Sequence, residues 1–375
     1  MTLNSQATLK TYRKDRSSKF IRQISLVCLT FLSFSSIGQS DDIAQADINA
    51  QADNDVHESI SVSTPPDSYT QQIKAFPSDS AHGWLEKMAY AHRNLNYSIS
   101  FVLLKPGVDS QPYLWRHGVS EQGVKMEQLN LLNGPGREVV RIGNKVSYFE
   151  PNVPPYSLQS NVINGPFPSE FFQQPDEIKA SYDFVMVGRS RVSGRAAQQI
   201  RVVSKDKSRF GMNVWLDQET GLMLKMNLVD LNGQLLEQIQ VTACHVTEQP
   251  DDFFEKIEPA MLPEVLELRP QAHTKAIWDI AYMPVGMVEV KRDIHRLPIT
   301  GLSVEYVMLS DGLVDVSIYM RESQNDGINQ DILLRHESDT LLTLNKGKLN
   351  VTVVGKLPPE TANHIANSIH LATTP

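Results

Sequence analysis

The feature that most constrains this chain is a repeated alternation of apolar and polar residues. Tyr97, Ile99, Phe101 and Leu103 alternate with Ser98, Ser100 and Val102, which is the period-two pattern of a strand with one buried face. Similar runs recur as far as residue 246. They predict roughly ten strands in up-and-down order, and therefore a large, strongly curved antiparallel sheet.

Short turn sequences separate several of these runs. Gly143-Asn144 lies between residues 137–142 and 145–150, and Leu231-Asn232-Gly233 lies between residues 222–230 and 234–246. The Asn-Gly pair of the second turn is a strong hairpin signal. Loop 218–220 is followed by Gly221, and glycine is the residue that a bulged turn favours. These turns predict antiparallel neighbours.

Two other segments flank or interrupt the strands. A short amphipathic helix is predicted where Trp84, Leu85, Met88, Ala89 and Ala91 share one face, with residues 78–80 as candidate N-caps. Residues 151–175 combine six prolines with Tyr and Phe residues, and proline at that density is excluded from a central strand. This segment is either an ordered lid packed on its own domain, which we favour, or an exposed binding loop.

Changes in composition divide the chain into five parts. Residues 1–40 read as a signal peptide, 41–80 as a disordered acidic spacer, 81–254 as the β domain, 255–275 as a proline-bearing linker and 276–375 as a small α+β domain. In the last part, strands are predicted at residues 288–290, 303–310, 313–320 and 350–355, and a helix after Pro358. The predicted fold class is mainly β with α.

The N-terminus indicates export. Six basic residues precede an uncharged stretch, residues 24–37, that is too short and serine-rich for a comfortable membrane span, although an uncleaved anchor stays the alternative. Removal of residues 1–40 changes the formal charge from −8 to −13, the opposite of what a nucleic-acid binder needs. Cys28 would leave with the signal, and Cys244 is expected to be a buried, inert thiol.

The sequence contains none of the common catalytic or nucleotide-binding motifs, and no enzyme activity, cofactor or metal is predicted. The histidines lack ligand-like spacing. Asp251, Asp252 and Glu255 are best explained as a solvated turn rather than as an acid/base pair. The loop that carries Lys205, Lys207 and Arg209 is either a charged turn or a contact for an anionic head group, and the sequence favours neither.

Several segments, in the same order along both domains, resemble the MucB/RseB family of envelope-stress sigma-factor regulators. They are residues 95–97, 100–101, 134–141, 146–151, 182–184, 187–189, 200–203, 214–217, 309–313 and 351–362. The N-terminal extension to about residue 80 has no recognised counterpart in the family, and residues 325–349 match loosely.

The resemblance implies a half-open β domain like those of the lipoprotein carriers LolA and LolB, joined to a smaller domain that binds a partner. It also implies a periplasmic regulator that binds the periplasmic region of a transmembrane anti-sigma factor and shields it from the site-one protease. Lipopolysaccharide or lipoprotein amphiphiles would release it. The alternative is a periplasmic carrier of lipoproteins or lipids, which leaves the second domain without a role; homo-oligomers are left open.

Candidate binding residues follow from these expectations. An apolar concave face for acyl chains is predicted from Tyr97, Phe101, Tyr148, Phe149, Phe184, Met186, Trp215, Leu222 and Leu224, each of which can equally fill a closed core. Candidate contacts with the partner are Arg292, Arg296 and Arg335, for which the alternative is a solvated charge.

Overall fold

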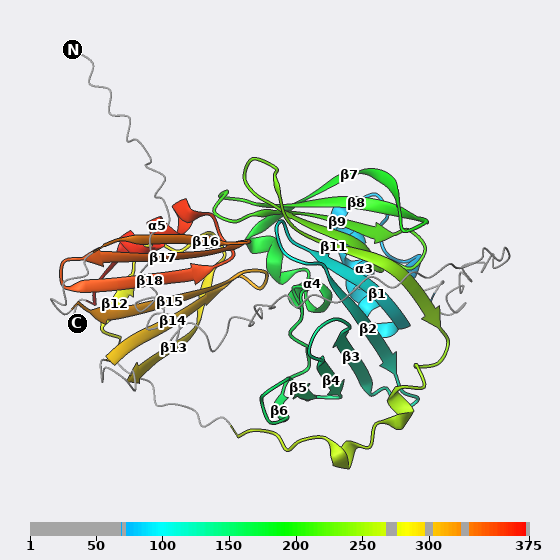
Figure 1. Ribbon diagram of the computed structural model, residues 1–375. Coiled ribbons are helices and arrows are strands. Elements are labelled where there is room, and N and C mark those ends of the chain that lie inside the picture. The colour runs from blue at the N-terminus through cyan, green and yellow to red at the C-terminus, as the bar shows by residue number, and fades with distance from the viewer. Residues whose placement is uncertain (1–68, 70–72, 268–275, 297–302, 324–329, 373–375) are drawn as a thin grey trace, which may run out of the picture. The chain divides into compact units, whose positions relative to one another are not determined.

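The computed structural model describes residue 69 and residues 73–267, 276–296, 303–323 and 330–372. The predicted signal peptide, the spacer up to residue 68 and linker residues 268–275 lie outside the described residues. The described residues cluster into one compact unit. It contains two large antiparallel sheets with separate apolar cores (Figure 1). We call residues 73–267 the sheet domain and residues 276–372 the C-terminal domain.

The sheet domain is built on one eleven-stranded sheet in the order β6-β5-β4-β3-β2-β1-β11-β10-β9-β8-β7. Apart from β1 and β11, neighbours in space are also neighbours in the chain, so the predicted up-and-down order is confirmed. The strands are β1 (Asn96–Leu104), β2 (Gln111–Val119), β3 (Lys125–Leu131), β4 (Arg137–Ile142), β5 (Lys145–Phe149), β6 (Tyr156–Gln159), β7 (Tyr182–Val192), β8 (Arg195–Ser204), β9 (Gly211–Asp217), β10 (Met223–Val229) and β11 (Leu235–Thr247).

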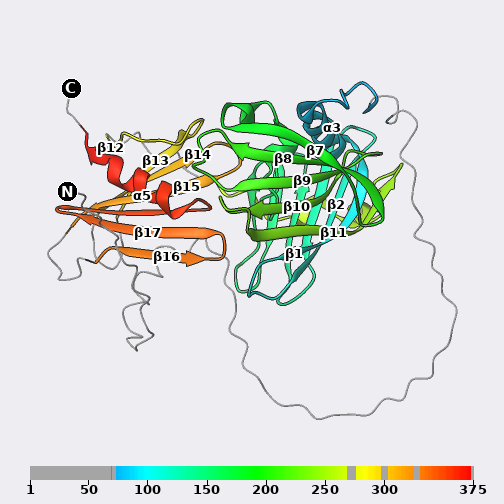
Figure 2. The same cartoon turned by 90° about the horizontal axis from the view of Figure 1, so that it is seen from above.

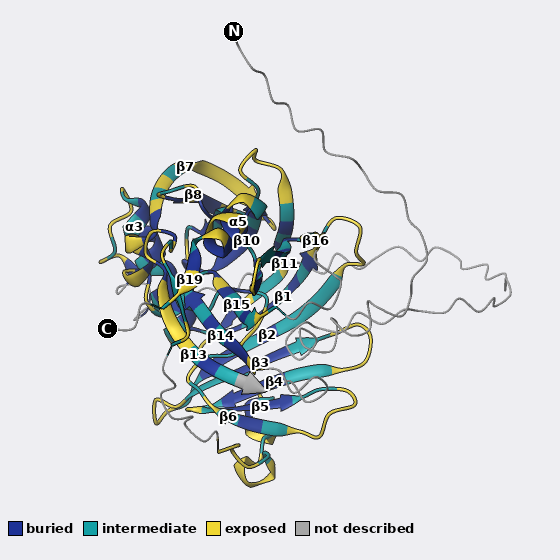
Figure 3. Ribbon diagram, turned by 90° about the vertical axis from the view of Figure 1, so that its left-hand side faces the viewer, coloured by how far each residue is buried: buried dark blue, intermediate teal, exposed yellow. Residues whose placement is uncertain are grey.

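This sheet is strongly curved, as predicted (Figure 2). Its two edge strands, β6 and β7, do not pair with each other. Strand β6 follows the first prolines of segment 151–175, and its edge position suits a segment in which proline removes hydrogen-bond donors. The opposite edge, β7, has a largely exposed outer surface, drawn yellow in Figure 3. The sheet is therefore open at β6 and β7.

The predicted hairpins form as expected. Ile142 pairs with Lys145 across the β4–β5 turn, where Gly143 adopts a positive φ of 61°. Strands β10 and β11 pair next to the Asn232-Gly233 turn. Gly221 has a φ of 84°, and a Cβ added there would lie 2.8 Å from Lys87 Cγ. Glycine at position 221 thus allows both the turn and close contact with the preceding helix.

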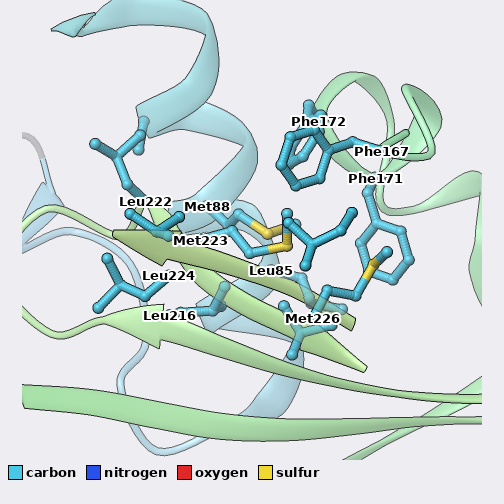
Figure 4. Close-up of a cluster of buried hydrophobic side chains, with 14 of the residues drawn as sticks. Leu85, Met88, Phe167, Phe171, Phe172, Leu216, Leu222, Met223, Leu224 and Met226 are labelled. Atoms are coloured by element: carbon cyan, nitrogen blue, oxygen red, sulfur yellow. The ribbon is translucent and has the colours of Figure 1, made fainter. Parts of the chain in front are cut away.

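Helix α3 (Ala81–Asn94) covers part of the sheet and confirms the predicted amphipathic helix. The Ser80 Oγ caps it by accepting a hydrogen bond from the Gly83 N–H at 3.0 Å. Leu85 and Met88 are fully buried because a spacing of three residues puts both on the face toward the sheet. They pack among Leu222, Leu224 and other core residues (Figure 4).

The proline-rich segment packs on its own domain, which confirms the lid interpretation. It contains helix α4 (Glu170–Gln173), and the 3-10 helix η1 (Glu177–Ala180) follows it. Phe167, Phe171 and Phe172 are buried in the core of the sheet domain (Figure 4). Beyond β11, the 3-10 helices η2 (Phe254–Lys256) and η3 (Pro259–Met261) follow, and Val265 forms a parallel bridge with Ser157. The described start of the linker is thus tied to β6.

The C-terminal domain contains a six-stranded sheet in the order β13-β14-β15-β18-β17-β16. Its helix α5 (Pro359–Ser368) packs on β17 and β18 through Ala362, Ile365 and Ala366. The small α+β domain is confirmed, although β13 is longer than predicted and the sequence did not indicate β12, β16, β17 or β19. The strands are β12 (Trp278–Ile280), β13 (Val288–Arg296), β14 (Ser303–Ser310), β15 (Asp315–Glu322), β16 (Ile332–His336), β17 (Asp339–Lys346), β18 (Leu349–Gly355) and β19 (Ile369–Leu371).

Among the described residues, no helix combines the length and the apolar character that a membrane span requires.

Candidate functional site

A cavity of about 370 Å³ has walls from both the sheet domain and the C-terminal domain, and we call it the shared cavity. Met212 of β9 and Met226 and Leu228 of β10 supply apolar side chains from the sheet domain. The volume falls in the range of small-molecule pockets, about 300–1,000 Å³. The remaining lining comes from Phe210, Glu237, loop residues 164–170, hairpin residues 312–315, Asp339, Gly355 and Lys356.

Arg209 links the two domains near this cavity. Its side chain and that of Asp311 are completely buried, and Arg209 Nε lies 3.0 Å from Asp311 Oδ2. The Tyr182 hydroxyl donates to the same carboxylate oxygen at 2.9 Å. Burial, and then the charge of Asp311, raise the pKa of Tyr182. The Arg209 guanidinium also donates to the Val285 carbonyl at 2.7 Å.

Asp206 makes a second link from the same loop, because its Oδ2 accepts from the Val285 N–H at 2.7 Å. Burial alone would raise the pKa of Asp206, but hydrogen bonds from Ser204, Ser208 and Val285 outweigh burial and hold the pKa well below its usual range. The loop was predicted to be either a charged turn or a head-group contact. For Arg209 the structure shows a third role, a buried contact between domains.

A third link lines the shared cavity itself. Lys356 Nζ donates to both carboxylate oxygens of Glu237, at 2.9 and 3.0 Å. Burial alone would raise the pKa of Glu237, but Lys356, Ser338 and Lys105 outweigh it and keep the pKa low. Lys105 also forms an ion pair with Glu337. A ligand that enters the shared cavity therefore meets the ionic contacts that join the domains.

A smaller cavity of about 130 Å³ lies within the sheet domain, and we call it the polar cavity. Helix α3, strands β2, β3 and β4 and the lid surround it.

None of the nine side chains predicted to bind acyl chains lines either of these two cavities. Among the nine, the structure buries Tyr97, Phe101, Leu222 and Leu224 in the main core of the sheet domain. It puts Tyr148 in a separate cluster with Val139 and Val146. The other four, Phe149, Phe184, Met186 and Trp215, are half-buried. The concave acyl face composed of these residues stays a prediction.

Met212, Met226 and Leu228 were absent from that predicted set although they lie on the same strands as Trp215 and Leu224. On β10 their signal was the alternation that Leu224 shares with Met226 and Leu228. On β9, Met212 alternates with Val214 and Leu216, on the face opposite to Trp215. The alternation marks a buried face, but it does not tell which end of the face is filled and which is left open to a cavity.

The three candidate partner contacts differ in their surroundings. Arg292 is paired with Glu289 at 2.6 Å and with Glu305, and it donates to the Trp278 carbonyl at 3.0 Å. The Arg335 side chain is exposed, with its guanidinium 5.9 Å from the centre of the Phe210 ring. The side chain of Arg296 lies outside the described residues. All three stay predictions.

Other polar candidates have structural partners. Burial raises the pKa of the half-buried Cys244 thiol to about 12, which keeps it protonated and unreactive at neutral pH. Asp251 forms an ion pair with Arg116 at 2.9 Å. His82, Glu86 and Asp176 lie close enough to share an ion, but the Lys179 ammonium occupies the group, 2.6 Å from Asp176 and 2.8 Å from His82.

The fold defines the class of protein: it is a two-domain β protein in which an open sheet is joined to a smaller α+β domain. The MucB/RseB N-terminal domain matches residues 80–266, and the MucB/RseB C-terminal domain matches residues 272–370. The chain belongs to the MucB/RseB family.

Relatives of known identity agree with this family assignment. The chain is 36% identical over 288 residues to the sigma-E factor regulatory protein RseB of Salmonella typhimurium, covering 76% of this chain and 89% of that protein. It is 28% identical over 302 residues to the sigma factor AlgU regulatory protein MucB of Pseudomonas aeruginosa, covering 79% and 93%. These relatives are named as regulatory proteins, not as enzymes.

Solved structures also match. A crystal structure of MucB in complex with MucA(peri) has a TM-score of 0.62 at 25% identity and covers 79% of this chain and all of that chain. The complex of Pseudomonas aeruginosa MucA and MucB has a TM-score of 0.63 at 25% identity, covering 78% and 99%.

Proposed function

We propose that this protein acts in the periplasm as a regulator that binds the periplasmic region of a transmembrane anti-sigma factor. Bound there, it protects that region from the site-one protease. Amphiphiles such as lipopolysaccharide or lipoprotein acyl chains release it. The family membership and the MucB structures with bound MucA support the partner.

The shared cavity is the observation that supports release by an amphiphile. Its apolar residues Met212, Met226 and Leu228 suit acyl chains, and each methylene transferred from water contributes about 0.8 kcal/mol. Glu237 and Lys356 line the same cavity and pair with each other across the two domains. An acyl chain in this cavity therefore changes the free energy of the contact between the domains.

Coupling between the two ligands then follows from linkage. An amphiphile displaces the partner only if the amphiphile-bound form has lower affinity for the partner, and the partner must weaken amphiphile binding by the same factor. We therefore expect both domains to be needed for tight partner binding, because the contact between them is the element that both ligands bias.

The first prediction tests this cavity with Leu228→Phe, which fills part of it. We expect the amphiphile concentration for half-maximal release of the partner to rise roughly fifteenfold, since a loss of about two methylenes of burial is worth roughly 1.6 kcal/mol. Affinity for the partner without amphiphile should stay unchanged. Fluorescence anisotropy of the labelled periplasmic fragment of the anti-sigma factor, titrated with lipopolysaccharide, measures both quantities.

The matched control is Leu231→Phe in the nearby β10–β11 turn, where Leu231 is half exposed and outside the cavity. Release from Leu228→Phe at the wild-type concentration would contradict the cavity assignment. If lipopolysaccharide binds but leaves partner affinity and protease protection unchanged in every variant, the protein is a carrier rather than a regulator.

A further inference from the structure

The polar cavity has features that the proposed function does not use. His117, Glu127 and Arg141 lie side by side on β2, β3 and β4, because His117 pairs with Glu127 and Glu127 with Arg141 in the strand register. Arg93 of α3 and Lys125 of β3 also line the cavity. Its apolar lining includes Trp115, Leu129, Phe167 and Phe172.

Two polar atoms in this lining have no hydrogen-bond partner. They are Arg141 Nε and His117 Nε2, and the residues that carry them are only 3% and 1% exposed. Buried polar atoms are nearly always hydrogen-bonded, because desolvation without a partner is costly. A donor and a ring nitrogen on two side chains that line one cavity therefore indicate a ligand with its own polar atoms.

The charge of the lining indicates which ligand. Arg93, Lys125 and Arg141 carry positive charges, whereas Glu127 is the single carboxylate and lies 2.8 Å from Arg141. Burial lowers the pKa of Lys125, and the charges of Arg93 and Arg141 lower it further. The cations thus repel one another across the cavity, and an anion would relieve that repulsion.

The hydrogen bonds of His117 define how it would meet an anion. Its Nδ1 lies 2.6 Å from the Leu95 carbonyl oxygen, an acceptor, so Nδ1 carries the proton. Burial lowers the pKa of His117, although Glu127 and this hydrogen bond oppose the shift. In the resulting neutral ring Nε2 has a free lone pair, and it becomes a donor only when the ring takes up a second proton.

The neighbouring His92 makes a useful contrast. Its Nε2 accepts from the Met223 N–H at 3.2 Å, and its Nδ1 lies 3.1 Å from the Tyr97 hydroxyl. Both ring nitrogens of His92 are therefore satisfied inside the protein, as expected for a structural core histidine. His117 differs because one of its nitrogens is left for a ligand.

We propose that the polar cavity binds one phosphate group, either free phosphate or the terminal phosphate of a lipid headgroup, and that His117 becomes doubly protonated as the anion binds. A phosphate monoester carries about −1.5 to −2 charges at pH 7, close to the excess of cations over carboxylate in the lining. At about 130 Å³ the polar cavity accommodates such a group but not a long acyl chain. The site is thus separate from the shared cavity.

The second proton on the His117 ring comes from the anion or from the solvent. A monoanionic phosphate transfers its P–OH proton to His117 Nε2, so the O–H bond breaks, an N–H bond forms and the bound phosphate becomes a dianion. A fully deprotonated oxyanion such as sulfate draws the proton from water instead. The groups that face His117 are His92 and Arg93 on α3, Tyr97 on β1, Lys125 and Glu127 on β3 and Arg141 on β4.

The test uses the full mature chain and the His117 ring resonance in nuclear magnetic resonance. We expect saturating sulfate, which does not titrate near neutral pH, to raise the midpoint of the His117 titration by about one unit. Linkage then requires sulfate to bind about tenfold more tightly below this midpoint than well above it. An unchanged His117 midpoint, or no phosphate or sulfate binding in calorimetry, would overturn the proposal.

Variants give an independent check. His117→Gln should abolish the pH dependence of sulfate binding, whereas His245→Gln, at an exposed position on β11, should leave it as in the wild type. Lys125→Gln, at a half-buried position, should weaken phosphate binding several-fold even if His117→Gln does not fold. Wild-type phosphate affinity in both Lys125→Gln and His117→Gln would refute the site.

Two short-chain lipids identify the source of the phosphate. The source is a lipid headgroup if dihexanoyl phosphatidic acid binds more tightly than inorganic phosphate and dihexanoyl phosphatidylcholine does not bind. Inorganic phosphate that binds more tightly than phosphatidic acid indicates the free ion. No anti-sigma fragment is present in these titrations, so their outcome is independent of the proposed regulatory function.

Discussion

At the scale of single residues, Arg209 and Asp311 form a fully buried ion pair. Neither side chain has any exposed surface, and one residue comes from each domain. The sequence showed Arg209 only as one of several charges in a loop, because nothing local indicates that its partner lies in another domain. The same is true of His117, whose free Nε2 becomes evident only when three strands are in register.

The second prediction concerns Asp311→Asn, which removes the nearer of the two carboxylates paired with the buried Arg209, at 3.0 Å against 3.8 Å for Asp206. Removing one partner of a buried ion pair costs about 3–5 kcal/mol, so we expect a clear fall in the free energy of unfolding. Asp315→Asn is the control in the same hairpin, because Asp315 is exposed. Urea denaturation followed by circular dichroism measures both; an Asp311→Asn variant as stable as Asp315→Asn would contradict the buried pair.

At the scale of elements, local sequence patterns predicted the strands, turns and helix faces that depend on neighbouring residues. The alternation in β1, the Asn232-Gly233 turn and the apolar face of α3 all formed as expected. Strands β16 and β17 were not predicted. In β16, Ile332 is half-buried and the four residues after it are exposed, so its sequence lacks a clear buried face. Cavities were also beyond prediction, since they depend on what the side chains fail to fill.

The third prediction tests the start of α3. Ser80→Ala removes the side chain that accepts a hydrogen bond from the Gly83 N–H, and loss of such a cap typically costs about 1 kcal/mol. Ser78→Ala is the matched control: Ser78 is exposed and contributes its carbonyl rather than its hydroxyl, accepting from Trp84 Nε1 at 3.0 Å. Thermal unfolding should show a lower midpoint for Ser80→Ala than for Ser78→Ala. Equal midpoints would argue against the cap.

At the scale of the whole molecule, the contacts that join the domains include Arg209 with Asp311, Asp206 with Val285, and Glu237 with Lys356. The family resemblance predicted two domains, but it supplied none of these residues. Each contact pairs positions far apart in the chain, so no spacing in the sequence indicates it.

The fourth prediction rests on the proposed function. Lys356→Gln weakens the contact between the domains across the shared cavity, so less amphiphile binding energy is needed to break that contact. If the contact loses about 1 kcal/mol, the lipopolysaccharide concentration for half-maximal partner release should fall roughly fivefold. Lys348→Gln, at an exposed position of the same domain, should behave as wild type. The anisotropy titration described above measures the change, and an unchanged or higher concentration would contradict it.

The adjacency of β1 and β11 has a consequence for folding kinetics. Asn96 pairs with Thr247, so the seam between the two halves of the sheet forms only when residues from the first and the last strand meet. Such non-local pairing is slow because a long loop must close before any contact compensates for its lost entropy. Until then β1 and β11 are both unpaired along that side, and unpaired strands are templates for association with other chains. An unfolded chain of this topology is therefore most exposed to aggregation before β11 pairs with β1.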